Sequence, residues 1–251
     1  MRSLVLFAYT ERPAAVENLT YFQTHGMAVV EEVDYVLIVN GEVCSVELSP
    51  RWHSVLRRSN NGLDFGAWRL ALGQFSVDNY DYLFCLNDTV RGPYHNVEWL
   101  GCFARLLTEE TLLAGITINI SSLPDVLTPL RENFAPHVQS MFWCTNKKGW
   151  RFLLPLLLQP EPVDKLELII LKEVGMSLSL LRAGYNITCI LPAYQHDYRL
   201  KDRWNEYAIR NYSAYSRTYG ETWFIGSYFG RTLHPSDVIF FKTNRGMVAE
   251  G

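Results

Sequence analysis

The stretch Tyr80-Asp81-Tyr82-Leu83-Phe84-Cys85-Leu86-Asn87-Asp88-Thr89 joins an apolar run to a polar tripeptide. A short apolar run rich in aromatic residues predicts a buried β-strand, here over Tyr80–Asn87. Asp88 then stands where the strand meets solvent. Ligands of open parallel sheets bind at the carboxyl ends of the strands. Asn87-Asp88-Thr89 is therefore the first candidate site, although a turn-forming Asn-Asp pair that only ends the strand explains the same residues.

Apolar runs of strand length alternate with segments of helical periodicity on both sides of this stretch. Further strands are expected over Leu4–Tyr9, Asp34–Val39, Leu112–Ile120, Val138–Thr145 and Tyr185–Leu191. Helices are expected over Pro13–His25, Asp64–Phe75, Val97–Leu107 and Val163–Leu181, and from near Asn146 into Phe152–Leu158. This order predicts an α/β fold with a mainly parallel central sheet flanked by helices. The residues beyond Tyr198 are expected to wrap irregularly around a single domain.

The composition narrows the class of protein. The chain has 251 residues, of which 48% are hydrophobic, as expected for a globular protein with a real core. Its net charge of −3 argues against a non-specific nucleic-acid binder. The five cysteines show no CxxC spacing, so they do not indicate a zinc or redox site. No apolar stretch is long enough for a transmembrane segment or a signal sequence. We therefore expect a soluble cytoplasmic protein, either free or peripheral to a membrane.

A second polar cluster, Asn60-Asn61-Gly62-Leu63-Asp64-Phe65-Gly66-Ala67-Trp68, opens the helix before the Tyr80–Asn87 strand. Gly62 and Gly66 permit close approach of a ligand to the backbone. Asp64 lies near the helix start, where it either caps the helix or contacts a nucleotide. Asp88 is an acid of the kind that Mg²⁺ or Mn²⁺ prefers as a ligand when the metal bridges phosphate oxygens.

The two clusters together resemble the rhamnan-synthesis F-type glycosyltransferases and their relatives in algae, fungi and large DNA viruses. The resemblance runs from about Asn60 to Arg245, and a more distant likeness connects the chain to the GT-A class of glycosyltransferases. It also includes Arg91-Gly92-Pro93, Pro136–Met141, Lys172–Ser177, Leu181–Ile187, Phe229–Pro235 and Phe240–Arg245. The fold that this implies is GT-A-like, with a Rossmann-like nucleotide-binding half over residues 1–120. Residues 121–251 would form the acceptor-binding half and the C-terminal wrap.

The resemblance also implies a donor site for a nucleoside-diphosphate sugar linked to UDP, GDP or dTDP. Asn61, Gly62 and Asp64 would lie near the nucleotide, and Asn87 and Asp88 near the diphosphate. Asp88 would take the place of an acid of the D-x-D motif of GT-A enzymes and bind a divalent metal, Mn²⁺ or Mg²⁺. Because Asn87-Asp88-Thr89 has only one carboxylate, the metal would need a further ligand. His196 is the first candidate for that ligand, and Asp197 is the alternative.

The resemblance implies that Glu173 is the general base, because it occupies the position of the acidic residue in a sequence signature that GT-A enzymes share. It would take the proton of the acceptor hydroxyl in an inverting transfer. Three basic residues, Arg91, Lys242 and Arg245, follow strand ends and are candidates for the diphosphate. His137 and Gln139 flank a strand and are candidates for the acceptor.

These expectations define a hexosyl-, deoxyhexosyl- or pentosyltransferase with a glycan or glycoprotein acceptor, active in polysaccharide biosynthesis. The alternative is a catalytically inactive carbohydrate-binding domain of the same fold, which the single acid of the Asn87-Asp88-Thr89 motif would suit. A Rossmann-type oxidoreductase ranks below both, because no G-x-G-x-x-G follows the first strand.

Overall fold

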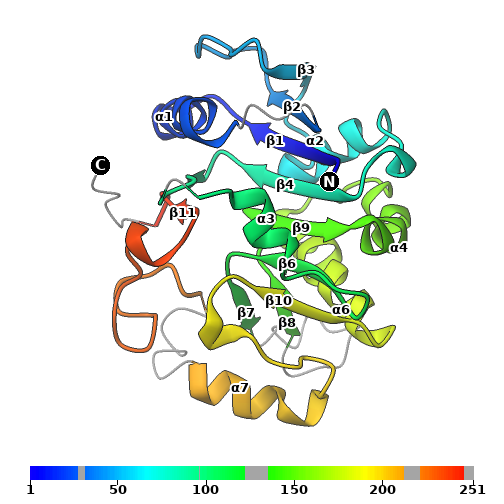
Figure 1. The fold of residues 1–251 in the computed structure, drawn as a ribbon, viewed down its shortest axis with the longest axis vertical. Helices are drawn as coiled ribbons and strands as arrows, with labels where there is room; N and C mark the ends of the chain where they lie inside the picture. Colours follow the sequence, from blue (N-terminus) through cyan, green and yellow to red (C-terminus); the bar gives the residue numbers. More distant parts are fainter. Residues whose placement is uncertain (28–31, 96, 122–134, 212–220, 246–251) are drawn as a thin grey trace.

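A computed structural model describes residues 1–27, 32–95, 97–121, 135–211 and 221–245 (Figure 1). The strands are β1 (Ser3–Tyr9), β2 (Val33–Asn40), β3 (Trp52–Arg58), β4 (Tyr82–Asn87), β5 (Val90–Arg91), β6 (Thr111–Gly115), β7 (Ile118–Ser121), β8 (Ala135–Val138), β9 (Phe142–Asn146), β10 (Asn186–Cys189) and β11 (Phe241–Lys242). The α-helices are α1 (Pro13–Tyr21), α2 (Leu63–Leu72), α3 (Trp99–Ala104), α4 (Lys147–Leu157), α5 (Lys165–Leu168), α6 (Gly175–Arg182) and α7 (Trp204–Asn211). No helix among the described residues is both long and apolar enough to cross a membrane.

Seven strands form one sheet in the order β10-β6-β9-β4-β1-β2-β3. β9 runs antiparallel to both of its neighbours, whereas the other paired strands of this sheet run parallel. The predicted α/β fold with a mainly parallel sheet is therefore confirmed. The carboxyl ends of β1, β2, β4 and β6 lie along one edge, which we call the carboxyl edge.

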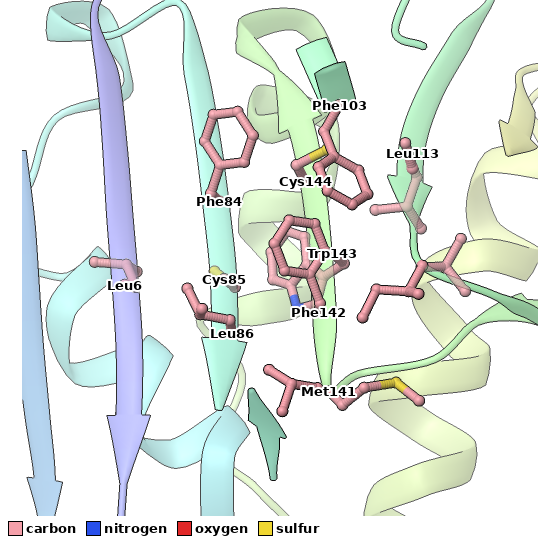
Figure 2. Close-up of a cluster of buried hydrophobic side chains, with 14 of the residues drawn as sticks. Leu6, Phe84, Cys85, Leu86, Phe103, Leu113, Met141, Phe142, Trp143 and Cys144 are labelled. Atoms are coloured by element: carbon pink, nitrogen blue, oxygen red, sulfur yellow. The ribbon is translucent and has the colours of Figure 1, made fainter. Parts of the chain in front are cut away.

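Helices cover both faces of this sheet. On β9, Phe142 packs against Phe103 of α3 with ring centroids 4.3 Å apart, and Trp143 packs against Trp68 of α2 at 5.7 Å. Because successive side chains of a strand point to opposite faces, α3 and α2 lie on opposite sides. Figure 2 shows Phe84, Phe142 and neighbouring apolar side chains filling the space around β4 and β9.

All seven tryptophans of the chain are buried. Trp68, Trp143 and Trp223 are fully buried, and Trp99 is 3% exposed. None of these tryptophan rings presents a face to solvent, so they stabilise the core rather than stack on a sugar.

Several element boundaries differ from the sequence prediction. The expected strand Leu112–Ile120 is divided into β6 and β7, and the expected strand Val138–Thr145 contains a break between β8 and β9. Gly115 ends β6, and a Cβ added there would lie 2.4 Å from Val138 Cγ1. The chains approach closely there, and β7 and β8 leave the main sheet to pair with each other.

Two further elements were not anticipated. β3 was missed because its side chains alternate between inward and outward positions at the edge of the sheet, so that it has no apolar run. The helix α7 occupies part of the C-terminal segment for which only irregular structure was expected. The last strand, β11, pairs with β5 and so brings the C-terminal segment beside the end of β4 (Figure 1).

Candidate functional site

The carboxyl end of β4 brings together the two polar clusters of the sequence. Asn87 is 4% exposed, and its Nδ2 donates to Asp64 Oδ2 at 2.5 Å. Its Oδ1 accepts from the Thr89 backbone N–H at 3.0 Å. Asp64 stands in the first turn of α2 but does not cap it, because Gly62 is the N-cap residue and no side chain caps this helix. The contact that Asp64 makes is therefore with the strand end.

Asp88 is also buried, with 4% of its surface exposed. Its Oδ2 accepts from the Thr10 backbone N–H at 2.6 Å, and its Oδ1 accepts from the Arg12 guanidinium. Burial raises the pKa of Asp88 to about 7, although Arg12 and Thr10 act in the opposite direction. Both oxygens of this carboxylate are thus held by the loop that follows β1.

Two cations lie within electrostatic reach of Asp64. Burial raises the pKa of Asp64, while the hydrogen bond from Asn87 and the charges of Arg12 and Lys242 lower it. The two cations come from opposite ends of the chain, so the fold gathers them around one partly buried acid.

Glu173 lies in a π-helical turn, Ile169–Val174, that joins α5 to α6. Its Oε2 accepts from the Ser140 backbone N–H at 2.8 Å, and its Oε1 lies 3.5 Å from His137 Nε2. Burial alone would raise the pKa of Glu173, but the contacts with His137 and Ser140 outweigh it and lower the pKa. Glu173 is therefore a largely buried carboxylate, 13% exposed, that is ionised at neutral pH.

A short loop connects Glu173 to the carboxyl end of β4, where the sugar donor is expected to bind. The Asn87 backbone N–H donates to the Met141 carbonyl at 3.1 Å, and the preceding residue, Ser140, donates to Glu173. Two adjacent loop residues thus bridge Asn87 and Glu173. The expected base and the expected donor residues lie at the same edge of the sheet.

Both ring nitrogens of His137 and the side-chain oxygen of Gln139 contact other groups of the protein. His137 Nδ1 donates to the Ala135 carbonyl at 2.7 Å, since a carbonyl can only accept, and this turns Nε2 towards Glu173. Gln139 Oε1 accepts from Thr117 Oγ1 at 2.7 Å. The structure therefore places His137 against the expected base and Gln139 against the β6–β7 connection.

The C-terminal segment contributes Lys242 and Arg245. Lys242 Nζ lies 3.5 Å from Glu221 Oε1, and Arg245 Nε donates to the same oxygen at 3.0 Å. Burial lowers the pKa of Lys242, and the charge of Glu221 opposes this effect. This trio of Glu221, Lys242 and Arg245 carries one net positive charge when all three groups are ionised.

Arg91 faces a different element. Its Nε donates to Asn18 Oδ1 at 3.0 Å, and its NH2 group donates to Glu17 Oε2 at 2.6 Å. Both partners belong to α1, so Arg91 ties β5 to that helix.

The glycine-bearing loop before α2 has a packing role. Gly62 has φ +74°, and a Cβ at this position would lie 2.6 Å from Glu161 Cγ. The carbonyl of the exposed Asn61 accepts from the Arg58 guanidinium. The turn and its contact with Glu161 are sufficient to require glycine here without a ligand.

His196 lies far from Asp88. Asn186, the first residue of β10, donates to the His196 carbonyl at 3.1 Å and accepts from the Tyr198 N–H at 2.9 Å. The strand register places Asn186 level with Thr111, at the amino ends of the parallel strands. At 3.3 Å per residue, this is about 20 Å along the strands from Asp88. The ring of His196 stacks on Tyr207 with centroids 4.2 Å apart.

The expected pair of metal ligands, Asp88 and His196, is therefore not assembled. Asp197, the alternative ligand, forms an ion pair with Arg199 beside His196. Within the described ranges, no three His, Cys, Asp or Glu residues form a group that could hold a metal ion. The described residues around Asp88 therefore do not fit a divalent cation.

A wide cavity of about 930 Å³ opens at the other edge of the sheet, beside Asp81 and Asn146. Its basic residues are already paired, for example Lys148 with Glu109 at 3.2 Å. The cavity lies at the amino end of β4, away from Asp64, Asp88 and Glu173, so we do not assign it as the site.

Sequence reasoning missed two charged residues of the carboxyl edge, Arg12 and Glu221. Arg12 stands just after the first strand, a position at which a ligand-binding residue is expected in a parallel sheet. That placement could have identified it. No local pattern marks Glu221, whose partners follow it by 21 and 24 residues.

The fold and this edge define an α/β protein with buried acids and partly covered cations at its strand ends. The family model for rhamnan synthesis protein F matches residues 36–151, which include Asp64, Asn87 and Asp88. The resemblance is thereby confirmed over that part of the chain, and it supports a glycosyltransferase that uses a nucleotide sugar.

The solved structures that resemble the chain include a mannosyltransferase, PcManGT from Pyrobaculum calidifontis, in complex with GDP-Man and Mn²⁺. The likeness has a TM-score of 0.49 and 13% sequence identity. It covers 83% of this chain and 64% of that chain, so the chain spans less than two thirds of that protein. No curated protein matches the sequence.

Proposed function

We propose that this protein is an inverting glycosyltransferase that moves a sugar from a nucleoside diphosphate to a hydroxyl group of a glycan. The observation that carries the proposal is the state of Glu173. This carboxylate is largely buried, with 13% of its side chain exposed, and it is ionised and oriented by the Ser140 N–H and by His137. It lies at the edge where Asn87 and Asp64 meet, as a base beside a donor site must.

The transfer requires one proton to move and two bonds to change. Glu173 accepts the proton of the acceptor hydroxyl while the acceptor oxygen forms a bond to the anomeric carbon of the donor sugar. The bond between that carbon and the phosphate oxygen breaks, and its electron pair remains on the nucleoside diphosphate. His137 acts as a positioning residue, because it contacts Glu173 through Nε2 and is anchored at Nδ1.

The donor would lie along the end of β4. Asp64 and Asn87 are the proposed contacts of the nucleoside. Lys242 and Arg245 are the proposed cations for the diphosphate, since they share a single acid, Glu221. Gly62 and Asn61 would shape the loop beside it. The nucleotide can be that of UDP, GDP or dTDP, and the acceptor would approach Glu173.

A panel of UDP-, GDP- and dTDP-linked hexoses, deoxyhexoses and pentoses tests the proposal. Release of nucleoside diphosphate that depends on an added glycan would support it. Glycan binding without turnover of any donor would instead identify an inactive carbohydrate-binding domain. Because a ligand that binds only the folded state raises the melting temperature, thermal shifts with each nucleotide form an independent measurement.

A further inference from the structure

The loop after β1 places an arginine where the sequence led us to expect a metal. Arg12 precedes α1, and its guanidinium donates to Asp88 Oδ1. We propose that Arg12 and Lys242 hold the donor diphosphate in place of a divalent cation, and that Asp88 positions Arg12. This inference rests on the proposed glycosyl transfer and specifies how its donor is bound.

The exposure of the Arg12–Asp88 pair is unequal. Asp88 is 4% exposed, whereas the Arg12 side chain is 46% exposed. A guanidinium has five N–H donors in a rigid plane, and the contact with Asp88 leaves others directed to solvent. Such a fork matches phosphate oxygens geometrically and can bind two of them at once. Arg12 is therefore anchored at its buried side and open at the other.

Asp88 is better suited to hold Arg12 than to hold a metal. A cation at its carboxylate would have to displace Arg12 and break the 2.6 Å hydrogen bond from the Thr10 N–H. Asp64, which acts on Asp88 electrostatically, would be the second protein ligand, and it would have to give up its own hydrogen bond. Asp64 already accepts a hydrogen bond from Asn87 at 2.5 Å.

The directed hydrogen-bond donors and the net positive charge at this edge come from different groups. The Arg12–Asp88 pair is neutral as a whole when both groups are ionised, so Arg12 contributes directed donors rather than net charge. The trio of Glu221, Lys242 and Arg245 contributes one net positive charge. Both Arg12 and Lys242 lie within electrostatic reach of Asp64. A leaving diphosphate at this edge therefore meets hydrogen-bond donors from one end of the chain and a positive charge from the other.

The start of α1 supports the same placement. Its first turn follows Arg12, contains Pro13, and is not capped by any side chain. Peptide N–H groups and the helix dipole at such an end favour an anion. Because Arg12 is itself the N-cap residue of α1, the guanidinium and the helix end belong to the same loop.

Titration calorimetry with UDP, GDP and dTDP tests the inference, each in excess EDTA and again with Mn²⁺. We expect at least one nucleotide to bind in EDTA about as tightly as with Mn²⁺. Arg12→Gln should weaken that binding by about tenfold to a hundredfold, the range for losing charge-assisted hydrogen bonds. Arg12→Lys should recover part of the loss, because the charge returns without the fork.

Two further variants test whether the loss of nucleotide binding is specific to Arg12. Arg151→Gln removes an exposed arginine that pairs with Asp78 at the other edge of the sheet, and it should leave binding unchanged. Asp88→Asn should cost less than Arg12→Gln, because an amide oxygen still accepts from Thr10. If Asp88 held a metal, the order of these two losses would be reversed.

The outcomes separate the inference from the proposed function. Binding that EDTA abolishes, or binding that Arg12→Gln leaves intact, overturns the inference while the glycosyltransferase proposal stands. Absence of binding to every nucleotide in both conditions overturns both.

Discussion

Replacing Glu173 with glutamine tests the proposed chemistry most directly. The substitution keeps one oxygen that can accept the Ser140 N–H, so the loop that joins Glu173 to Asn87 should persist. It removes the carboxylate that faces His137 at 3.5 Å, and with it the ability to accept a proton. The expected change in folding free energy is about 1 kcal/mol, the value of one weakened charge-assisted hydrogen bond.

The effect on activity should be far larger than the effect on stability. General base catalysis contributes about 10²–10⁴-fold to a rate, which corresponds to about 3–5 kcal/mol of transition-state free energy. We expect kcat to fall by this factor while the dissociation constant of the nucleotide changes little, because Asp64, Arg12 and Lys242 remain. The assay is release of nucleoside diphosphate at saturating donor and acceptor, with nucleotide binding measured separately by calorimetry.

Glu206→Gln is a suitable control, since Glu206 is a helical glutamate of α7 that pairs with Arg203. It should leave kcat unchanged. A Glu173→Gln enzyme that melts like the wild type and keeps its kcat within about threefold would refute the assignment of the base, because no effect of the expected size would then remain.

The pH dependence follows from the same carboxylate. Its pKa is lowered in the folded protein, so Glu173 stays ionised, and competent as a base, to pH values below the usual glutamate range. The stability that it contributes is present above the unfolded-state pKa and is lost as the pH falls through the folded-state pKa. The stability difference between wild type and Glu173→Gln should therefore shrink in acid, as denaturant titrations at several pH values would show.

Three other substitutions are predicted from the structure. Lys242→Met should weaken nucleoside-diphosphate binding by about tenfold in calorimetry, because it removes a cation near Asp64, and an equal loss in the remote Lys201→Met would contradict this. Gly62→Ala should lower the free energy of unfolding in urea by about 1–2 kcal/mol more than Gly184→Ala. Both glycines have positive φ, but only Gly62 is crowded by Glu161, so equal losses would show that the packing contact is unimportant. Trp143→Ala should cost about 3–5 kcal/mol in the same measurement, since its ring is fully buried against Trp68 between β9 and α2, and a cost below about 1 kcal/mol would be inconsistent with that burial.

The contacts of His137 and Gln139 also bear on how the acceptor is bound. His137 and Gln139 were expected to contact it, yet their polar atoms bind Ala135, Glu173 and Thr117. Recognition of the acceptor by His137 would require its contacts to break. We therefore propose that His137 positions Glu173.

The strands and the edge at which the chemistry lies could be derived from local sequence. Apolar runs such as Leu83–Leu86 identify buried strands, and the polar residue that ends each run is carried to the carboxyl edge by the parallel order. The proximity of Asp64 and Asn87 follows from this, because the end of one strand and the start of the helix before it meet at that edge. Hydrophobic periodicity is a local property, so a local pattern suffices for these features.

The partners of the charged residues depend on the tertiary structure alone. Arg12 and Asp88 are separated by 76 residues, and nothing in either neighbourhood marks the other. The loop after β10 returns His196 to the amino ends of the strands, although its position after a strand suggested the opposite edge. Loop direction and ion pairing are determined by packing between distant segments, which periodicity does not record. The sequence by itself thus determined the sheet and the acid at its edge, and only the tertiary structure decided that this acid holds an arginine.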